Sequence, residues 1–92
     1  MPAPDRSAPN ISALADMCLG FLAENPEELL GFMQHAGLTP DALRAAIGSD
    51  RLRHGLIDYF AANEPILLAL CANSGTTPEQ FMRAWHRLNQ VE

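Results

Sequence analysis

The sequence contains no lysine, and its six positively charged residues are all arginine. Eleven acidic residues outnumber them, which gives a formal net charge of −5. Proteins that bind nucleic acid or anionic membranes broadly need a basic surface, so this balance argues against both kinds of partner. The all-arginine set fits codon usage in a GC-rich genome, and the alternative is selection for bidentate contacts with anions.

Cysteine is scarce as well. The only two, Cys18 and Cys71, lie far apart among apolar neighbours, and no Cys-x-x-Cys spacing occurs. This pattern predicts buried free thiols of a cytoplasmic protein, with a disulfide between them as the alternative.

Long hydrophobic runs are missing. The longest strongly apolar stretch, Ile66–Ala72, is far shorter than a bilayer-spanning helix. Residues 1–9 hold three prolines and lack the apolar run of a signal peptide, which predicts a flexible tail. We therefore expect a cytoplasmic protein without membrane contact, in which residues 10–92 form a single helical domain.

No segment alternates apolar and polar residues with period two over a useful length, so no strands are expected. Apolar residues recur instead at three- and four-residue spacing in six segments, which predicts an all-α bundle of six helices. Residues with strong capping preferences mark the helix ends. The expected starts are Asn10 or Ser12, Asn25, Thr39, Ser49 or Asp50, Asn63 and Thr77, and the expected stops include Gly37, Gly48 and Gly75.

The apolar positions of these segments form the expected core. The fifth segment is apolar on nearly every side, which predicts a central place in the bundle or a covering partner. Trp85 lies on the apolar stripe of the sixth segment, which favours core packing over an exposed contact. The other expected inward positions are Ile11, Leu14, Met17, Cys18, Phe21, Leu22, Leu29, Leu30, Phe32, Met33, Leu43, Ala46, Ile47, Leu52, Leu56, Tyr59, Phe60, Phe81, Met82 and Leu88.

The two halves of the chain align at an offset of 38 residues. Nine of the 33 positions from 14 to 46 are identical to their counterparts, and most of these mark helix ends or apolar positions. The offset predicts two related three-helix units, about residues 10–48 and 49–90. Two copies are too few for an open solenoid, so we expect the units to close on each other around a pseudo-two-fold axis. The second and fifth helices would then meet near that axis.

Three segments resemble a known family. They are residues 19–29 (LGFLAENPEEL), 37–44 (GLTPDALR) and 56–60 (LIDYF). Together with the residues around them, from about 12 to 88, they are similar to the small alphaproteobacterial proteins grouped as domain of unknown function 3572. The resemblance implies an all-helical, cytoplasmic bacterial protein, and it implies no activity and no catalytic residues.

No residue cluster predicts an active site, metal site or cofactor site. His35, His54 and His86 have no His or Cys three or four residues away, a spacing that would favour metal binding on a helix. The serines stand in no nucleophile motif, and no glycine-rich phosphate loop occurs. Glu27 and Glu28 are better explained as acidic residues at a helix start than as paired catalytic carboxylates. We therefore predict a protein that is not an enzyme and needs no cofactor.

Two groups of basic residues are candidates for partner binding. Arg44, Arg51, Arg53 and His54 lie around the junction of the two units, and Arg83 and Arg87 lie in the sixth helix. If the two groups converge they can bind an acidic partner or a phosphate, and otherwise they are solvated helix faces.

The leading functional hypothesis is a non-enzymatic protein–protein interaction module, either a homodimer or an adaptor. It rests on more apolar helix surface than a monomer of this size needs, together with the missing chemistry. The alternative is a small DNA-binding regulator, because Leu30–Ile47 and Leu68–Trp85 each read as helix, turn and helix. The second helix of Leu30–Ile47 carries only Arg44, with Asp41 near its start, whereas a recognition helix needs several donors.

Overall fold

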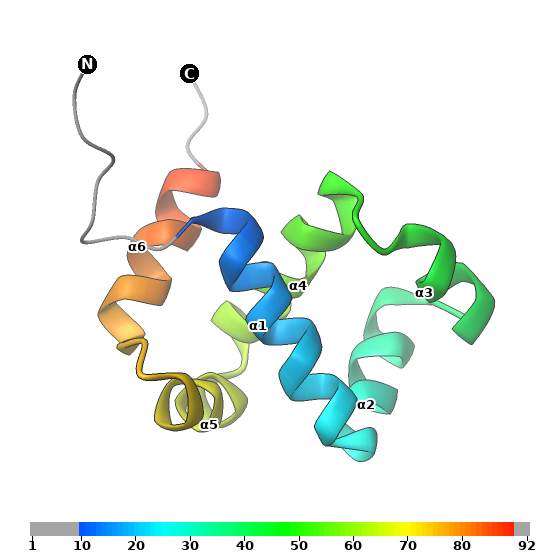
Figure 1. The fold of residues 1–92 in the computed structure, drawn as a ribbon, viewed down its shortest axis with the longest axis horizontal. Coiled ribbons are helices and arrows are strands. Elements are labelled where there is room, and N and C mark those ends of the chain that lie inside the picture. The colour runs from blue at the N-terminus through cyan, green and yellow to red at the C-terminus, as the bar shows by residue number, and fades with distance from the viewer. Residues whose placement is uncertain (1–9, 90–92) are drawn as a thin grey trace.

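The computed structural model describes residues 10–89, and this part of the chain consists of α-helices joined by short turns, without a strand (Figure 1). The all-α prediction is therefore confirmed. The flexible tail predicted for residues 1–9 lies outside the described residues. The six helices are α1 (Ile11–Glu24), α2 (Pro26–Ala36), α3 (Pro40–Ala46), α4 (Asp50–Ala62), α5 (Glu64–Ser74) and α6 (Pro78–Leu88).

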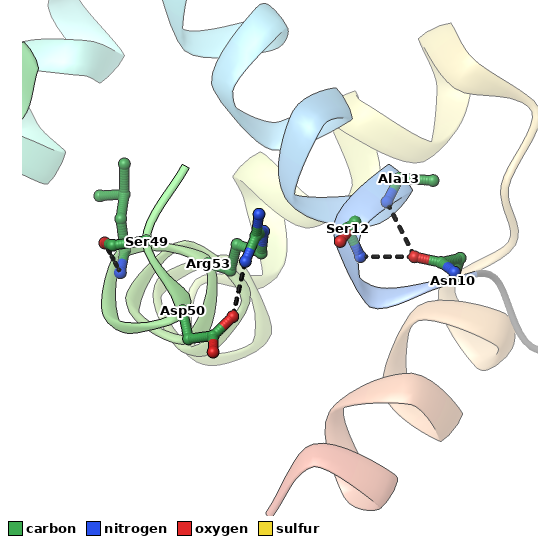
Figure 2. Close-up of polar contacts among 7 residues, drawn as sticks. Asn10, Ser12, Ala13, Ser49, Asp50 and Arg53 are labelled. Atoms are coloured by element: carbon green, nitrogen blue, oxygen red, sulfur yellow. Dashed lines mark hydrogen bonds and ion pairs between the residues drawn. The ribbon is translucent and has the colours of Figure 1, made fainter. Parts of the chain in front are cut away.

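Most helix starts are capped as the sequence predicts. The Asn10 side chain accepts hydrogen bonds from the backbone N–H groups of Ser12 and Ala13, at 2.7 and 3.4 Å (Figure 2). Thr39 and Ser49 each accept one from the residue three positions on, at 3.1 Å. Thr77 and the residue three positions after it form a reciprocal capping box. These bonds satisfy N–H groups that have no partner within the helix.

Asn25 and Asn63 occupy the N-cap positions of α2 and α5, which confirms the predicted helix starts, but their side chains do not form the expected cap hydrogen bonds. Neither side chain accepts a bond from α2 or α5. Each side-chain amide instead donates backwards, Asn25 Nδ2 to the Phe21 carbonyl at 2.8 Å and Asn63 Nδ2 to the Tyr59 carbonyl at 2.6 Å. Both asparagines therefore stabilise the end of the preceding helix, where carbonyl groups lack partners.

Glycine is required where two of the helices end. Gly37 after α2 and Gly75 after α5 have φ angles of 70° and 80°, in the left-handed region that other residues rarely adopt. The backbone N–H of Gly75 donates to the Cys71 carbonyl at 3.0 Å. The predicted stops at these two glycines are confirmed.

The central pair of the bundle is α1 with α4, which share the most extensive contact between any two helices. The prediction that α2 and α5 meet near the centre is wrong, since they lie on opposite sides of α1 (Figure 1). The physical reason is the width of the buried faces. α2 buries only Phe32, whereas α1, α4 and α5 each bury four apolar side chains, so α2 has too narrow a buried face to be central.

Three large apolar side chains are exposed, although the sequence pattern places two of them inward and the third on a helix expected at the centre. They are Leu30 on α2, Ile47 after α3 and Leu68 on α5, with 52%, 54% and 48% of their surface exposed. Conversely, Ile57 and Ala84 are fully buried although they were not among the expected core positions. Leu30 on α2 and Ile47 directly after α3 lie where the chain has few close neighbours, because α3 packs only sparsely and α2 contacts mainly α1 and α4.

Several helix bounds follow the 38-residue offset, although α6 is four residues longer than α3. α2 spans residues 26–36 and α5 spans 64–74, while α1 and α4 end at residues 24 and 62. The surroundings of the equivalent helices differ, because α5 packs against α1, α4 and α6, whereas α2 has no third neighbour of that kind. Similarity of the two units in three dimensions stays a prediction.

No single helix among residues 10–89 is long and apolar enough to cross a membrane. α4 and α5 reach the required length and composition only in combination, and the chain bends by 107° between them.

Candidate functional site

An open groove lies between the end of α2, the end of α3 and the first two turns of α4. It has a volume of about 800 Å³ and is partly open to solvent. Both sides of the groove therefore come from segments that are close in the sequence, on either side of α3. Its lining residues are Phe32, Ala36, Gly37, Leu38, Ala46, Ser49, Asp50, Arg51, Leu52, His54, Gly55 and Asp58.

The lining of the groove combines apolar residues with small side chains. Phe32 and Leu52 are buried residues of the core whose edges reach the groove, and Leu38 is half-buried beside them. The small side chains include Ala36 and Ala46. A lining of this kind leaves room for a ligand with a broad apolar surface, since most ligand sites combine an apolar lining with a few polar groups.

Gly55 lies in the middle of α4 and faces the groove. Its backbone is helical, so the conformation itself does not require glycine. A Cβ atom built at this position meets nothing within 4 Å, so no neighbour in the protein requires its absence either. Glycine inside a helix lowers stability by about 1 kcal/mol relative to alanine. Gly20 on α1 shares this openness, so the feature particular to Gly55 is its place in the lining of the groove.

Gly55→Ala is expected to raise the free energy of unfolding by about 0.5–1 kcal/mol, because alanine restricts the unfolded chain and favours the helix. Gly20→Ala in α1 is a matched control, since a Cβ there also meets nothing within 4 Å and is expected to stabilise by a similar amount. Urea unfolding followed by circular dichroism measures both. A loss of stability in Gly55→Ala alone would contradict the open space around this position.

The charged residues on the rim differ in how many partners they have. Asp50 forms an ion pair with Arg53 at 2.6 Å, one turn along α4 (Figure 2). Arg51 is exposed, and its guanidinium forms no hydrogen bond or ion pair with any residue of the described range. Arg51, Gly55 and Asp58 share one face of α4, because they are separated by four and three residues.

Asp58 belongs to a polar cluster that joins α4 to the end of α6. The Trp85 indole N–H donates to Asp58 Oδ1 at 2.8 Å, and Asn89 Nδ2 donates to the same oxygen at 3.4 Å. His54 Nε2 lies 3.6 Å from Asp58 Oδ2 and 3.4 Å from Asn89 Oδ1. Trp85 is therefore half-buried, with its polar edge satisfied by a carboxylate, rather than a fully buried core residue.

Trp85→Phe is expected to lower the free energy of unfolding by about 1–2 kcal/mol, because it removes a hydrogen bond to a charged acceptor that is partly exposed. Asp58→Asn keeps the size of the side chain and weakens the same bond. A double-mutant cycle measured by urea unfolding and circular dichroism should give a coupling energy of about 1 kcal/mol between the two positions. Additive losses would mean that the bond contributes nothing to stability.

The candidate basic residues are spread over α3, α4 and α6. Arg51 and His54 line the groove, whereas Arg44 pairs with Asp41 at 3.0 Å on exposed α3. Arg83 and Arg87 belong to α6, and α3 and α6 lie toward opposite ends of the long dimension of the molecule (Figure 1). The arginine of α3 is therefore separated from those of α6.

α3 does not support the helix-turn-helix interpretation, because it offers few side chains that could contact DNA. This helix has only seven residues, and its single arginine already forms the ion pair with Asp41. In the described part of the chain, no group of three or more His, Cys, Asp or Glu side chains is placed to hold a metal ion.

The groove was not predicted from the sequence, although one signal for it was present. A glycine in the middle of a helical segment, four residues after Arg51 and three before Asp58, is visible in the sequence itself. What the sequence does not show is that no other described helix covers α4 at Gly55, although α6 contacts α4 at Asp58.

Fold and surface together define a small all-helical protein with an open groove and buried thiols. The chain belongs to the family described as "Protein of unknown function (DUF3572)", whose model matches residues 8–90. Comparison with curated proteins gives no match, and comparison with solved structures gives none either.

Proposed function

We propose that this protein is a non-enzymatic interaction module whose groove binds a helix of a protein partner. The observation that carries the proposal is the place of Gly55 in the lining of the groove, where neither the backbone of α4 nor any neighbouring side chain requires glycine. Helices pack with their axes 8–10 Å apart, and the shorter distances need small side chains at the contact. Gly55 provides such a contact next to the apolar lining residues Phe32 and Leu52.

The polar groups of the groove support binding rather than catalysis. The Ser49 hydroxyl already accepts a hydrogen bond from the Leu52 backbone N–H at 3.1 Å, as a helix cap. His54 is directed to Asp58 and Asn89, so it is not paired with a hydroxyl or thiol nucleophile. A nucleophile within hydrogen-bond reach of a base is the usual sign of covalent catalysis. In keeping with this function, we expect the protein to work in the bacterial cytoplasm.

The experiment uses the full-length chain as bait in extracts of its native cell, with the groove blocked in one variant. Gly55→Leu places a large side chain in the groove, and Gly20→Leu places the same side chain at an open position on α1. Proteins that bind the groove should be captured by the wild-type chain and by Gly20→Leu but not by Gly55→Leu, as measured by quantitative mass spectrometry. Equal capture by all three baits would overturn the proposal.

A further inference from the structure

The outer face of α5 is an apolar helix surface that no described residue covers. Its exposed residues include Pro65, Leu68, Ala69 and Ala72, and Leu68 has 48% of its surface exposed. An exposed helix face is normally polar, and apolar patches on a small protein mark interaction sites. The inner and outer faces of α5 are both apolar, but only the inner face packs against the described part of this chain.

One acidic residue lies at the start of this face. Glu64 is exposed, and its carboxylate forms no ion pair or hydrogen bond with the described residues. Glu64, Leu68 and Ala72 follow one another at four-residue steps, so they form a single stripe along α5.

The groove offers the complement of this stripe. Arg51 is the rim residue whose charged group has no partner among residues 10–89, and Gly55, four residues later, is bare. Four residues of a helix advance by about 6 Å. A helix laid parallel to α4 with Glu64 beside Arg51 would therefore place Leu68 over Gly55. The carboxylate of Asp58 does not compete with Glu64 for Arg51, because it already accepts hydrogen bonds from Trp85 and Asn89.

We infer that the helix bound by the groove is α5 of a second copy of this chain, with Glu64 paired to Arg51 and Leu68 seated over Gly55. This inference rests on the proposed function, and it names the partner. α2 is the weaker candidate for the docked helix, although its exposed Leu30 corresponds to Leu68. Leu30 is followed on its face by Gln34 rather than by alanine, and α2 already forms a wall of the groove.

The docking would be head to tail. No residue of α5 lines the groove, and α5 lies on the other side of α1 from α2 (Figure 1). Each copy in a pair would thus keep one free groove or one free α5 face, and such contacts extend to rings or filaments. α5 has 11 residues, about 16 Å of helix, so the interface is small and the association should be weak and concentration-dependent.

The decisive experiment mixes two variants that each lack one side of the contact. Gly55→Leu blocks the groove and leaves α5 intact, while Leu68→Asp disrupts the α5 face and leaves the groove intact. Sedimentation velocity from about 1 µM to about 1 mM covers the range expected for a small interface. Each variant alone should stay monomeric, and an equimolar mixture should form a dimer of two 10.0 kDa chains that does not grow further. The wild-type chain should form larger species under the same conditions.

Matched controls separate this contact from general stickiness. Gly20→Leu and Leu30→Asp make the same substitutions at an open glycine and at an equally exposed leucine, and both should associate like the wild-type chain. Arg51→Glu and Glu64→Arg should each weaken association by about two- to fivefold, and the double variant should restore it. Circular dichroism confirms that each variant is folded.

A mixture of folded Gly55→Leu and Leu68→Asp that stays monomeric at every concentration would overturn the inference, as would a loss of association in either control. The proposed function is tested by the capture experiment and does not depend on this result. Capture of other proteins that Gly55→Leu abolishes would preserve the groove as a binding site, with a partner other than this chain. Failure of both experiments would remove the function and the inference together.

Discussion

Phe60→Ala is expected to lower the free energy of unfolding by about 3–5 kcal/mol, the range for a large aromatic residue removed from a core. Phe60 is fully buried and joins three helices. Its ring lies 6.0 Å from that of Phe21 on α1, edge to face, and 6.4 Å from that of Phe81 on α6. The cavity left by alanine would border all three helices, and a small domain has a total stability of only about 5–15 kcal/mol.

Urea unfolding followed by circular dichroism measures the loss. Phe60→Leu keeps most of the apolar volume. Its free energy of unfolding should therefore fall by only about 1–2 kcal/mol, because fewer buried carbon atoms are removed. Leu30→Ala removes an apolar side chain that is 52% exposed, and its effect should remain below about 1 kcal/mol. A loss in Phe60→Ala as small as that in Leu30→Ala would show that α1, α4 and α6 do not share a packed core.

The free energy of unfolding is also expected to fall as the pH rises above about 9. Burial raises the pKa of the Cys18 thiol to about 12, from an ordinary value of 9.0, and repulsion from the Cys71 thiolate adds to the shift. The folded protein therefore keeps a proton that the unfolded chain has already lost. Stability from this thiol is complete below pH 9 and is lost as the pH rises from 9 toward 12, at up to about 1.4 kcal/mol per pH unit.

The pKa of the Cys71 thiol is raised in the same direction, by burial and by the nearby charge of Glu79, so it adds to the same loss. The absence of lysine makes the effect easier to measure, because no lysine side chain titrates in this window. Urea unfolding at pH 7, 8, 9, 10 and 11 gives the slope, and Cys18→Ala should flatten it. Equal pH dependence in the wild-type chain and in Cys18→Ala would contradict the buried thiol as its source.

Helix ends were predicted well because their signals are local. Thr77 caps α6 by a bond to a residue three positions away, and Gly37 ends α2 by its own φ angle. Such signals act within one turn of helix, so they can be recognised without knowing the rest of the fold. Asn25 shows the limit of this reasoning. Its side chain has both a donor and an acceptor, and the sequence does not show whether it bonds the helix after it or the helix before it.

The core was predicted less completely, because a periodic apolar pattern does not say what covers each face. Leu30 and Leu68 lie in apolar patterns as strong as those of buried residues, yet about half of each is exposed. Their exposure follows from the choice of α1 and α4 as the central pair. Once these two helices meet, α2 and α5 are placed on opposite sides and each keeps an outward face.

The sequence by itself determined the fold class, the number of helices, their ends and the burial of the two thiols, since these depend on propensity, capping and apolar spacing along one segment. Only the tertiary structure decided that α1 and α4 are central, that the arginines of α3 and α6 are apart, and that Gly55 faces an open groove. Those features depend on which helix faces meet, and that choice is made by packing between segments far apart in the chain. The candidate site belongs to this second group, because a groove exists only where packing leaves a surface uncovered.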